Sequence, residues 1–171
     1  RLVLNQLGVS DASFYKSIAS FTGASKRLEV VKKGETGTLF KDFAHSPSKL
    51  KATLDAVKKQ FESRKLVACM ELHTFSSLRS DFLDQYAGTM DLADEAIVYF
   101  NPEVVKKKKL DPLSIEQVKA AFKNENVLVF DKTEDVLSWI HSYKWNHSNL
   151  LMMSSGNFDG IDYKNLGNEI F

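Results

Sequence analysis

Four short apolar runs decide the fold of this chain: LVACM at 66–70, AIVYF at 96–100, VLVF at 127–130 and LLMM at 150–153. Each run is continuous rather than alternating, which is typical of strands buried on both faces of a parallel sheet. Amphipathic segments separate the runs, as they do in βαβ units. The pattern predicts a doubly wound, mostly parallel sheet with helices on both faces.

Capping residues and glycines mark the remaining elements of this Rossmann-like α/β domain. Two strands around the glycines at 34 and 37 predict an N-terminal hairpin. Ser46 before Pro47 is typical of a helix start, and Ser114 with Gln117 is typical of a capping box. We expect two strands in that hairpin, at 26–31 and 38–43. We expect helices at 8–21 (capped by Ser10 and ended by Gly23), at 47–61 and at 82–90, and three more that begin at 115, after a Thr133 cap, and at about 161. The lysines at 106–109 are expected to lie in a solvated loop.

The composition of the chain argues against several classes of function. Of 171 residues, 23 are Lys or Arg and 22 are Asp or Glu, so a net charge of +1 gives no basic surface for nucleic acid. The apolar runs are far shorter than the roughly 20 residues that span a bilayer, so no membrane partner is expected. The single cysteine, Cys69, favours a reducing compartment and lies in an apolar run, where we expect an inert thiol. P-loop, dinucleotide and zinc-ligand motifs are not found.

Three polar loops follow predicted strands, at 42–47, 71–79 and 154–160. Ligands of parallel sheets bind beyond the carboxyl ends of the strands, so these loops are the candidate site. Asp42 could accept hydrogen bonds from sugar hydroxyls, and the helix start after it favours an anion. Purely local roles remain open for all three loops: an Asx-turn at Asp42 beside a half-exposed His45, a hydroxyl-rich helix cap at 71–79, and a plain strand-to-helix turn at 154–160.

Five segments, in chain order, resemble the Mur ligases. FTGASKRLE at 21–29 and DFAHSP at 42–47 are similar to the F-x-G-x-x-R-R-[FL]-[ED] and D-[YF]-[AG]-H-x-P segments at the start of their C-terminal domain. MELHTFS at 70–76 is similar to F-Q-P-H-R-[YF]-[ST], and AD at 93–94 to the pair before the next strand. MSSGNFDGI at 153–161 resembles the M-S-[NS]-G-[GN]-F-x-G-I loop of the subgroup that joins UDP-N-acetylmuramate to L-alanyl-γ-D-glutamyl-meso-diaminopimelate.

The resemblance implies a three-domain cytoplasmic enzyme. Residues 1–24 would be the tail helix of its central domain and residues 25–171 its C-terminal domain, and Arg1 would be a fragment boundary. The N-terminal domain would bind the UDP-sugar, and the central domain would carry the P-loop and most of the contacts to ATP and Mg²⁺. The fragment alone is therefore expected to be inactive.

The chemistry that the resemblance implies is ATP-driven amide bond formation. A muramyl carboxylate attacks the γ-phosphate of ATP, and the amine of the incoming peptide then attacks the activated carbonyl. By resemblance, Arg27 and Asp42 would bind ATP, and His45, His73, Thr74, Ser155, Gly156 and Asn157 would face the amine substrate. None of these is assigned as a catalytic base.

One departure from the family bears on the substrate. Alanine-adding relatives have H-R-[YF]-[ST]-R where this chain has HTFSS at 73–77, so both arginine positions, Thr74 and Ser77, are neutral. Those arginines are expected to hold the carboxylate of a single amino acid, and their loss favours a tripeptide. A UDP-N-acetylmuramate–L-alanine ligase domain, or a non-catalytic module that binds a nucleotide or an acidic ligand, remains an alternative.

Overall fold

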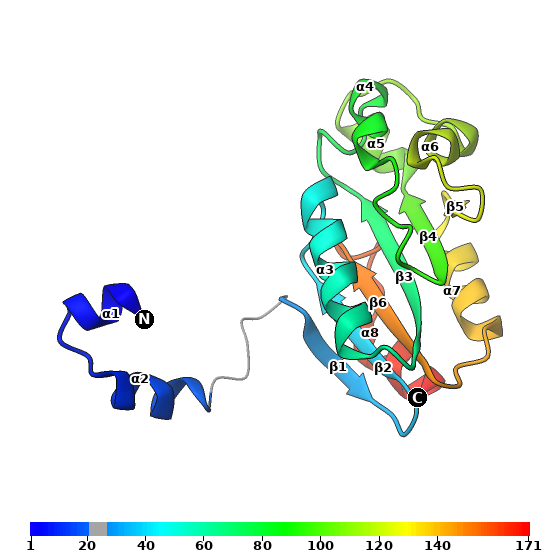
Figure 1. The fold of residues 1–171 in the computed structure, drawn as a ribbon. Coiled ribbons are helices and arrows are strands. Elements are labelled where there is room, and N and C mark those ends of the chain that lie inside the picture. The colour runs from blue at the N-terminus through cyan, green and yellow to red at the C-terminus, as the bar shows by residue number, and fades with distance from the viewer. Residues whose placement is uncertain (21–26) are drawn as a thin grey trace.

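The computed structural model describes residues 1–20 and 27–171 (Figure 1). A six-stranded sheet in the order β1-β2-β6-β3-β4-β5 forms its body. The strands are β1 (Glu29–Lys33), β2 (Thr38–Asp42), β3 (Lys65–Leu72), β4 (Glu95–Phe100), β5 (Leu128–Phe130) and β6 (Ser148–Met153). Of the described pairs, β1 and β2 are antiparallel and the others are parallel. The predicted mostly parallel sheet with an N-terminal hairpin is confirmed.

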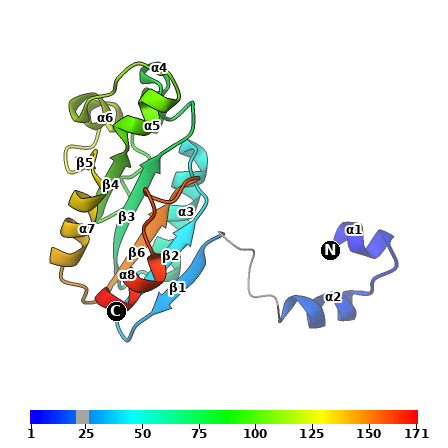
Figure 2. The ribbon, with the colours of Figure 1, turned by 180° about the vertical axis from the view of Figure 1, so that it is seen from behind.

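Helices cover both faces of the sheet, because successive strand residues point in opposite directions. Ala68 and Met70 of β3 pack in the cluster beneath α3, α4, α5 and α6. Val67 and Cys69 pack in a second cluster beneath α7 and α8 on the opposite face (Figures 1 and 2). These helices are α3 (Pro47–Gln60), α4 (Ser80–Leu83), α5 (Pro102–Lys107), α6 (Ile115–Phe122), α7 (Thr133–Ser142) and α8 (Tyr163–Ile170).

Two helix starts agree with the sequence, and a third differs. Pro47 is the first residue of α3, with Ser46 at the N-cap position. Ser114 and Gln117 form the predicted capping box of α6. Thr133 was expected to cap α7 but is its first residue, and Lys132 occupies the N-cap position. The Thr133 hydroxyl lies 2.9 Å from the Tyr99 hydroxyl, so it contacts β4 rather than its own helix.

Two local predictions between β3 and α6 are wrong. The helix expected at 82–90 is broken into α4, one 3₁₀ turn, η1 (Asp84–Tyr86), and further turns, because Ala87 after η1 has a ψ of 124°, outside helical geometry, and Gly88 follows with a φ of 66°. Lys106 and Lys107 lie in α5 rather than in a loop. Pro102 begins that helix, and the Asn101 side chain accepts the Glu103 N–H at 2.8 Å, which explains its start.

The first twenty residues form two helices, α1 (Leu2–Gln6), which was not expected, and α2 (Asp11–Ile18). Ser10 caps α2 as predicted, since its hydroxyl oxygen accepts the Ser13 N–H at 3.2 Å. The expected helix end at Gly23 and the expected domain boundary after residue 24 lie outside the described residues. Across residues 1–20 and 27–171, no helix has the length and apolar character needed to cross a bilayer.

The strand order places three predicted loops side by side. β6 lies between β2 and β3, and Met153 pairs with Asp42 on one side and Met70 on the other. Because neighbouring strands lie about 4.8 Å apart, the ends of these three strands lie within about 10 Å. The loops after Asp42, Leu72 and Met153 therefore leave the same edge of the sheet.

Candidate functional site

Asp42, at the end of β2, holds the chain that leads into β1. Its carboxylate is 9% exposed, and it accepts the Leu28 N–H at 2.6 Å and the Ala44 N–H at 2.7 Å. Leu28 has a φ of 44°, a conformation that side chains other than glycine seldom adopt. Asp42 therefore stabilises a strained residue next to Arg27. The contact with Ala44 is the Asx-turn that the local alternative for Asp42 described.

The two residues predicted to bind ATP line one small hollow. Arg27 is exposed at its rim beside Asp42, and the cavity measures about 230 Å³. Lys49 and Thr53 of α3 also line it, together with Phe43, Ala44 and Ala52. The cationic Lys49, which the sequence did not single out, joins Arg27 there. The hollow can receive an anionic group at Arg27 and Lys49, next to hydrogen-bond acceptors on Asp42.

His45 is half-buried before α3, and its orientation is set by backbone groups. Its Nδ1 lies 2.8 Å from the Phe43 carbonyl oxygen, which can only accept, so Nδ1 carries a proton and donates. The Tyr86 hydroxyl donates to the His45 carbonyl at 2.6 Å. Burial raises the pKa of Tyr86 to about 12, so this donor stays protonated at neutral pH.

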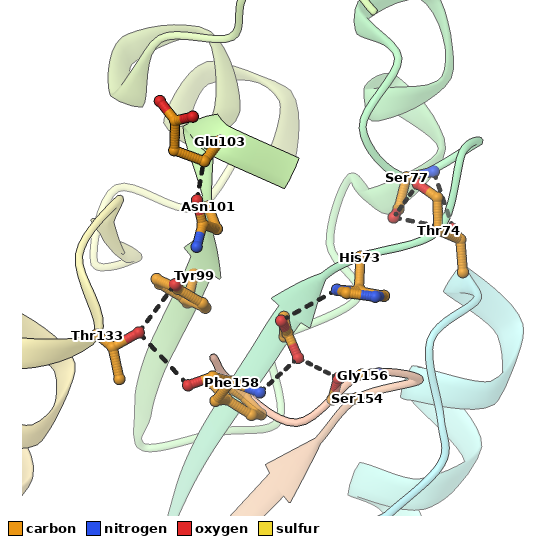
Figure 3. Close-up of polar contacts among 11 residues, drawn as sticks. His73, Thr74, Ser77, Tyr99, Asn101, Glu103, Thr133, Ser154, Gly156 and Phe158 are labelled. Carbon is orange, nitrogen blue, oxygen red and sulfur yellow. Dashed lines mark hydrogen bonds and ion pairs between the residues drawn. The ribbon is translucent and has the colours of Figure 1, made fainter. Parts of the chain in front are cut away.

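Glu71 connects the loop after β3 to the loop after β6 through contacts with His73, Ser154 and Phe158, the three partners labelled in Figure 3. Its carboxylate is 2% exposed, and one oxygen accepts from the Ser154 hydroxyl and from the Phe158 N–H at 2.8 Å. The other oxygen lies 3.2 Å from Nδ1 of His73. Burying a carboxylate is unfavourable unless donors surround it, and here donors reach both oxygens. Sequence reasoning missed this role, although a charge within the apolar strand LVACMEL is a signal for it.

The loop after Met153 contains three further predicted residues, and one of them, Gly156, packs against His73. Gly156 lies so close that a β-carbon on it would be 2.8 Å from Cγ of His73, which explains the glycine. The buried Ser155 hydroxyl oxygen has no hydrogen-bond partner among the described residues, and Asn157 is exposed. The structure thus brings His73 and the loop 155–157 together.

Thr74 and Ser77 bond to each other rather than to the loop after β6. The Thr74 hydroxyl donates to Ser77 Oγ at 2.9 Å, and the Ser77 N–H donates back to Thr74 Oγ1 at 3.1 Å. Arg79, the next cation along this loop, donates two hydrogen bonds to the Asp81 carboxylate. The loop therefore presents hydroxyl groups, and its arginine already has a carboxylate partner.

Tyr99 and Thr133 support the far end of the loop after β6 (Figure 3). The ring of Phe158 stacks on Tyr99 at 5.8 Å between centroids, and the Thr133 hydroxyl lies 3.4 Å from the Phe158 carbonyl oxygen. Burial raises the pKa of Tyr99, so its hydroxyl stays protonated and hydrogen-bonded. The sequence assigned Thr133 to a helix cap and gave no signal for this contact.

Comparison with known proteins shows which proteins this chain is similar to in sequence. The family model described as "Mur ligase, glutamate ligase domain" matches residues 26–156. The UDP-N-acetylmuramate–L-alanine ligases of Caldicellulosiruptor bescii and Cutibacterium acnes are 40% and 37% identical over 96 and 93 residues, or 56% and 54% of this chain. The chain spans about a fifth of the length of these curated relatives, with 21% and 20% covered.

Solved structures share the fold. A murein peptide ligase from Psychrobacter arcticus superposes with a TM-score of 0.70 and 25% identity, covering 96% of this chain and 35% of that one. A UDP-N-acetylmuramate–alanine ligase from Thermotoga maritima gives a TM-score of 0.68 at 20% identity, covering 92% and 33% of the two chains. A ligase domain from Haemophilus ducreyi gives a TM-score of 0.58 at 22% identity, and the superposition covers 85% of this chain and 100% of that one. By its sequence match and its fold, the chain belongs to the Mur ligase family, as a glutamate ligase domain.

Proposed function

We propose that this chain is the C-terminal domain of an ATP-dependent ligase that joins L-alanyl-γ-D-glutamyl-meso-diaminopimelate to UDP-N-acetylmuramate through an amide bond, in peptidoglycan recycling in the cytoplasm. One observation carries the proposal: β6 lies between β2 and β3, so the predicted nucleotide side at Asp42 and the predicted amine side at His73 share one sheet edge. A ligase needs that juxtaposition, because its catalytic gain comes largely from positioning two substrates.

On the nucleotide side, the residues present suit an anionic group. Arg27 and Lys49 supply positive charge, and Asp42 supplies acceptors beside them. A hollow of about 230 Å³ receives only part of a nucleotide, which agrees with ATP contacts shared with a P-loop domain. When bound, ATP supplies the phosphoryl group that activates a carboxylate.

The described residues suit ATP and Mg²⁺ differently. Within the described residues, no group of three or more His, Cys, Asp or Glu side chains is arranged to hold a metal ion. These residues do not fit a magnesium site, and we derive no step through Mg²⁺ from them.

On the amine side, the chain's own groups suit a long substrate better than alanine. Thr74 and Ser77 satisfy each other and offer no cation to a carboxylate. His73, a third of whose side chain is exposed, and the exposed Asn157 offer a ring nitrogen and an amide group instead. Hydrogen-bonding groups of this kind suit the amide bonds of a peptide.

The second candidate is a UDP-N-acetylmuramate–L-alanine ligase. The curated relatives cited above carry that name, and this favours alanine as the incoming substrate. The two candidates differ in the amine that they use and share the UDP-sugar and ATP.

The test uses the product of the complete open reading frame. With UDP-N-acetylmuramate and ATP present, we expect ADP release on adding the tripeptide and little on adding L-alanine. ADP release with L-alanine and not with tripeptide would select the second candidate. If neither amine supports release, the ligase proposal fails in favour of a non-catalytic binding module, which nucleotide titration by calorimetry would then examine.

A further inference from the structure

A buried carboxylate that is not among the site residues predicted from the sequence, Glu71, lies between the two loops of the predicted amine side. Glu71 lies near the carboxyl end of β3 and is 2% exposed, and its hydrogen-bond partners among the described residues include no Lys or Arg. The Ser154 hydroxyl and the Phe158 N–H both donate to it, and the Ser154 hydroxyl itself accepts the Gly156 N–H at 2.6 Å and so turns its own proton to Glu71. Glu71 therefore acts as an acceptor through both oxygens.

The first consequence concerns His73. A carboxylate cannot donate, so the 3.2 Å contact requires the proton on Nδ1 of His73. The neutral imidazole then carries its lone pair on Nε2, and a third of the His73 side chain remains exposed. Glu71 thus decides which ring nitrogen is available to a ligand.

The second consequence concerns the loop after β6. Phe158 and Asp159 have φ values of 50° and 58°, which side chains other than glycine adopt at a cost. Such a conformation persists only where neighbouring contacts hold it, and the Phe158 N–H is held by Glu71 at 2.8 Å across 87 residues of sequence. The same oxygen holds Ser154 at the beginning of the loop.

We propose that Glu71 is a positioning residue of the amine-substrate side. Its carboxylate fixes the Nδ1–H tautomer of His73 and the conformation of 154–158 together, so that both segments meet the incoming amine in one geometry. This role rests on the proposed function for its substrate. The family segment that resembles 70–76 has glutamine here, and a glutamine has one accepting oxygen and one donating amide nitrogen. A carboxylate can therefore impose a tautomer that glutamine cannot.

The test compares the wild-type chain with Glu71→Gln by long-range ¹H–¹⁵N correlation of the imidazole nitrogens, at a pH where the ring is neutral. In the wild type we expect Nδ1–H on His73. In the variant, the side-chain amide oxygen at position 71 accepts from the Ser154 hydroxyl and the Phe158 N–H, so the NH₂ group of the same side chain faces Nδ1 of His73. Because this NH₂ group donates, Nδ1 has to accept, and the imidazole proton moves to Nε2. Glu169→Gln is the matched control, because Glu169 contacts a different imidazole, Nε2 of His141, at 2.9 Å, and should leave the His73 pattern unchanged.

The wild-type spectrum alone decides the proposal if the variant does not fold, since an Nε2–H tautomer there would overturn it. An unchanged tautomer in Glu71→Gln would overturn it as well. Amide exchange gives a second measurement: Glu71→Ala should speed exchange of the Phe158 N–H about tenfold or more, while the amides of β4 keep their protection.

The substrate part of the proposal has its own measurement. In the complete ligase, Glu71→Gln should raise the KM for the amine substrate at least severalfold and leave the KM for ATP unchanged. An unchanged KM for the amine would overturn the positioning role. A wild-type enzyme without tripeptide activity would instead contradict the proposed function and leave the tautomer result standing.

Discussion

Gly156 and His73 come from different strand ends and pack directly against each other. A β-carbon on Gly156 would lie 2.8 Å from both Cγ and Nδ1 of His73 and 2.9 Å from a carboxylate oxygen of Glu71. No real β-carbon approaches a ring so closely, so the absence of a side chain at position 156 is what allows the loop after β6 to close on the histidine.

Gly156→Ala should force the loop away from His73. Overpacking of this kind typically costs about 1–3 kcal/mol in free energy of unfolding, measured by urea denaturation. We also expect the imidazole resonances of His73 to shift. Gly160→Ala is the matched control in the same loop: nothing lies within 4 Å of its β-carbon, and its cost comes from a φ of 94°. Equal shifts of His73 in both variants would contradict the packing explanation.

Asp42→Ala should destabilise the domain, because it leaves the Leu28 and Ala44 N–H groups without their acceptor. Each unsatisfied buried donor costs about 1–3 kcal/mol, so the urea midpoint should fall clearly. Thr53→Ala is the control, since it removes only a 3.4 Å contact to the same carboxylate. If Thr53→Ala lowered the urea midpoint as much as Asp42→Ala does, the unsatisfied backbone N–H groups would not be the reason for the loss of stability.

Asp94 should make the stability of the domain depend on acid pH. Burial raises its pKa, but hydrogen bonds from Lys58 and the Leu66 N–H, with the charges of Lys58 and Lys65, outweigh that and hold the pKa below its usual value. A lowered carboxyl pKa adds stability above the unfolded value of about 3.9 and loses it as pH falls through the folded value.

Asp94→Asn should therefore be less stable than the wild type at pH 7, with the difference shrinking below about pH 4. Urea unfolding over that pH range measures it. Asp55→Asn, which removes the exposed pair of Asp55 with Lys59, is the control and should change little. A constant difference between wild type and Asp94→Asn at all pH values would contradict the linkage.

Cys69 should be unreactive in the folded protein. It is fully buried in β3, and burial, with the nearby Glu71 charge, raises the pKa of its thiol. Since the thiolate is the nucleophile, a disulfide reagent should label the single cysteine only after denaturant is added. Labelling of the native protein as fast as that of free glutathione would contradict this burial.

The sequence was sufficient where the signal is local. Continuous apolar runs specify strands buried on both faces, and Pro47 and the box of Ser114 with Gln117 specify helix starts, because those effects act within a few residues. The helix expected at 82–90 failed because the backbone leaves helical geometry at Ala87 and Gly88, which no periodicity reveals.

The carboxyl-end rule selected three loops that the structure places at one edge of the sheet. It assigned the loops at 42–47, 71–79 and 154–160 to one candidate site, but it did not give the order of the strands in the sheet. That step needed the strand order, and the order places β6 between β2 and β3.

Only the tertiary structure assigned the contacts that join those loops. Glu71 meets Ser154 and Phe158 across 83 and 87 residues of sequence, and Thr133 meets Tyr99 across 34. Such contacts depend on strand order, on register and on backbone turns of positive φ, which are settled by packing of the whole sheet rather than by neighbouring residues. The amino-acid sequence by itself determined the class of fold and predicted the edge of the candidate site, and packing decided which side chain joins the loops at that edge.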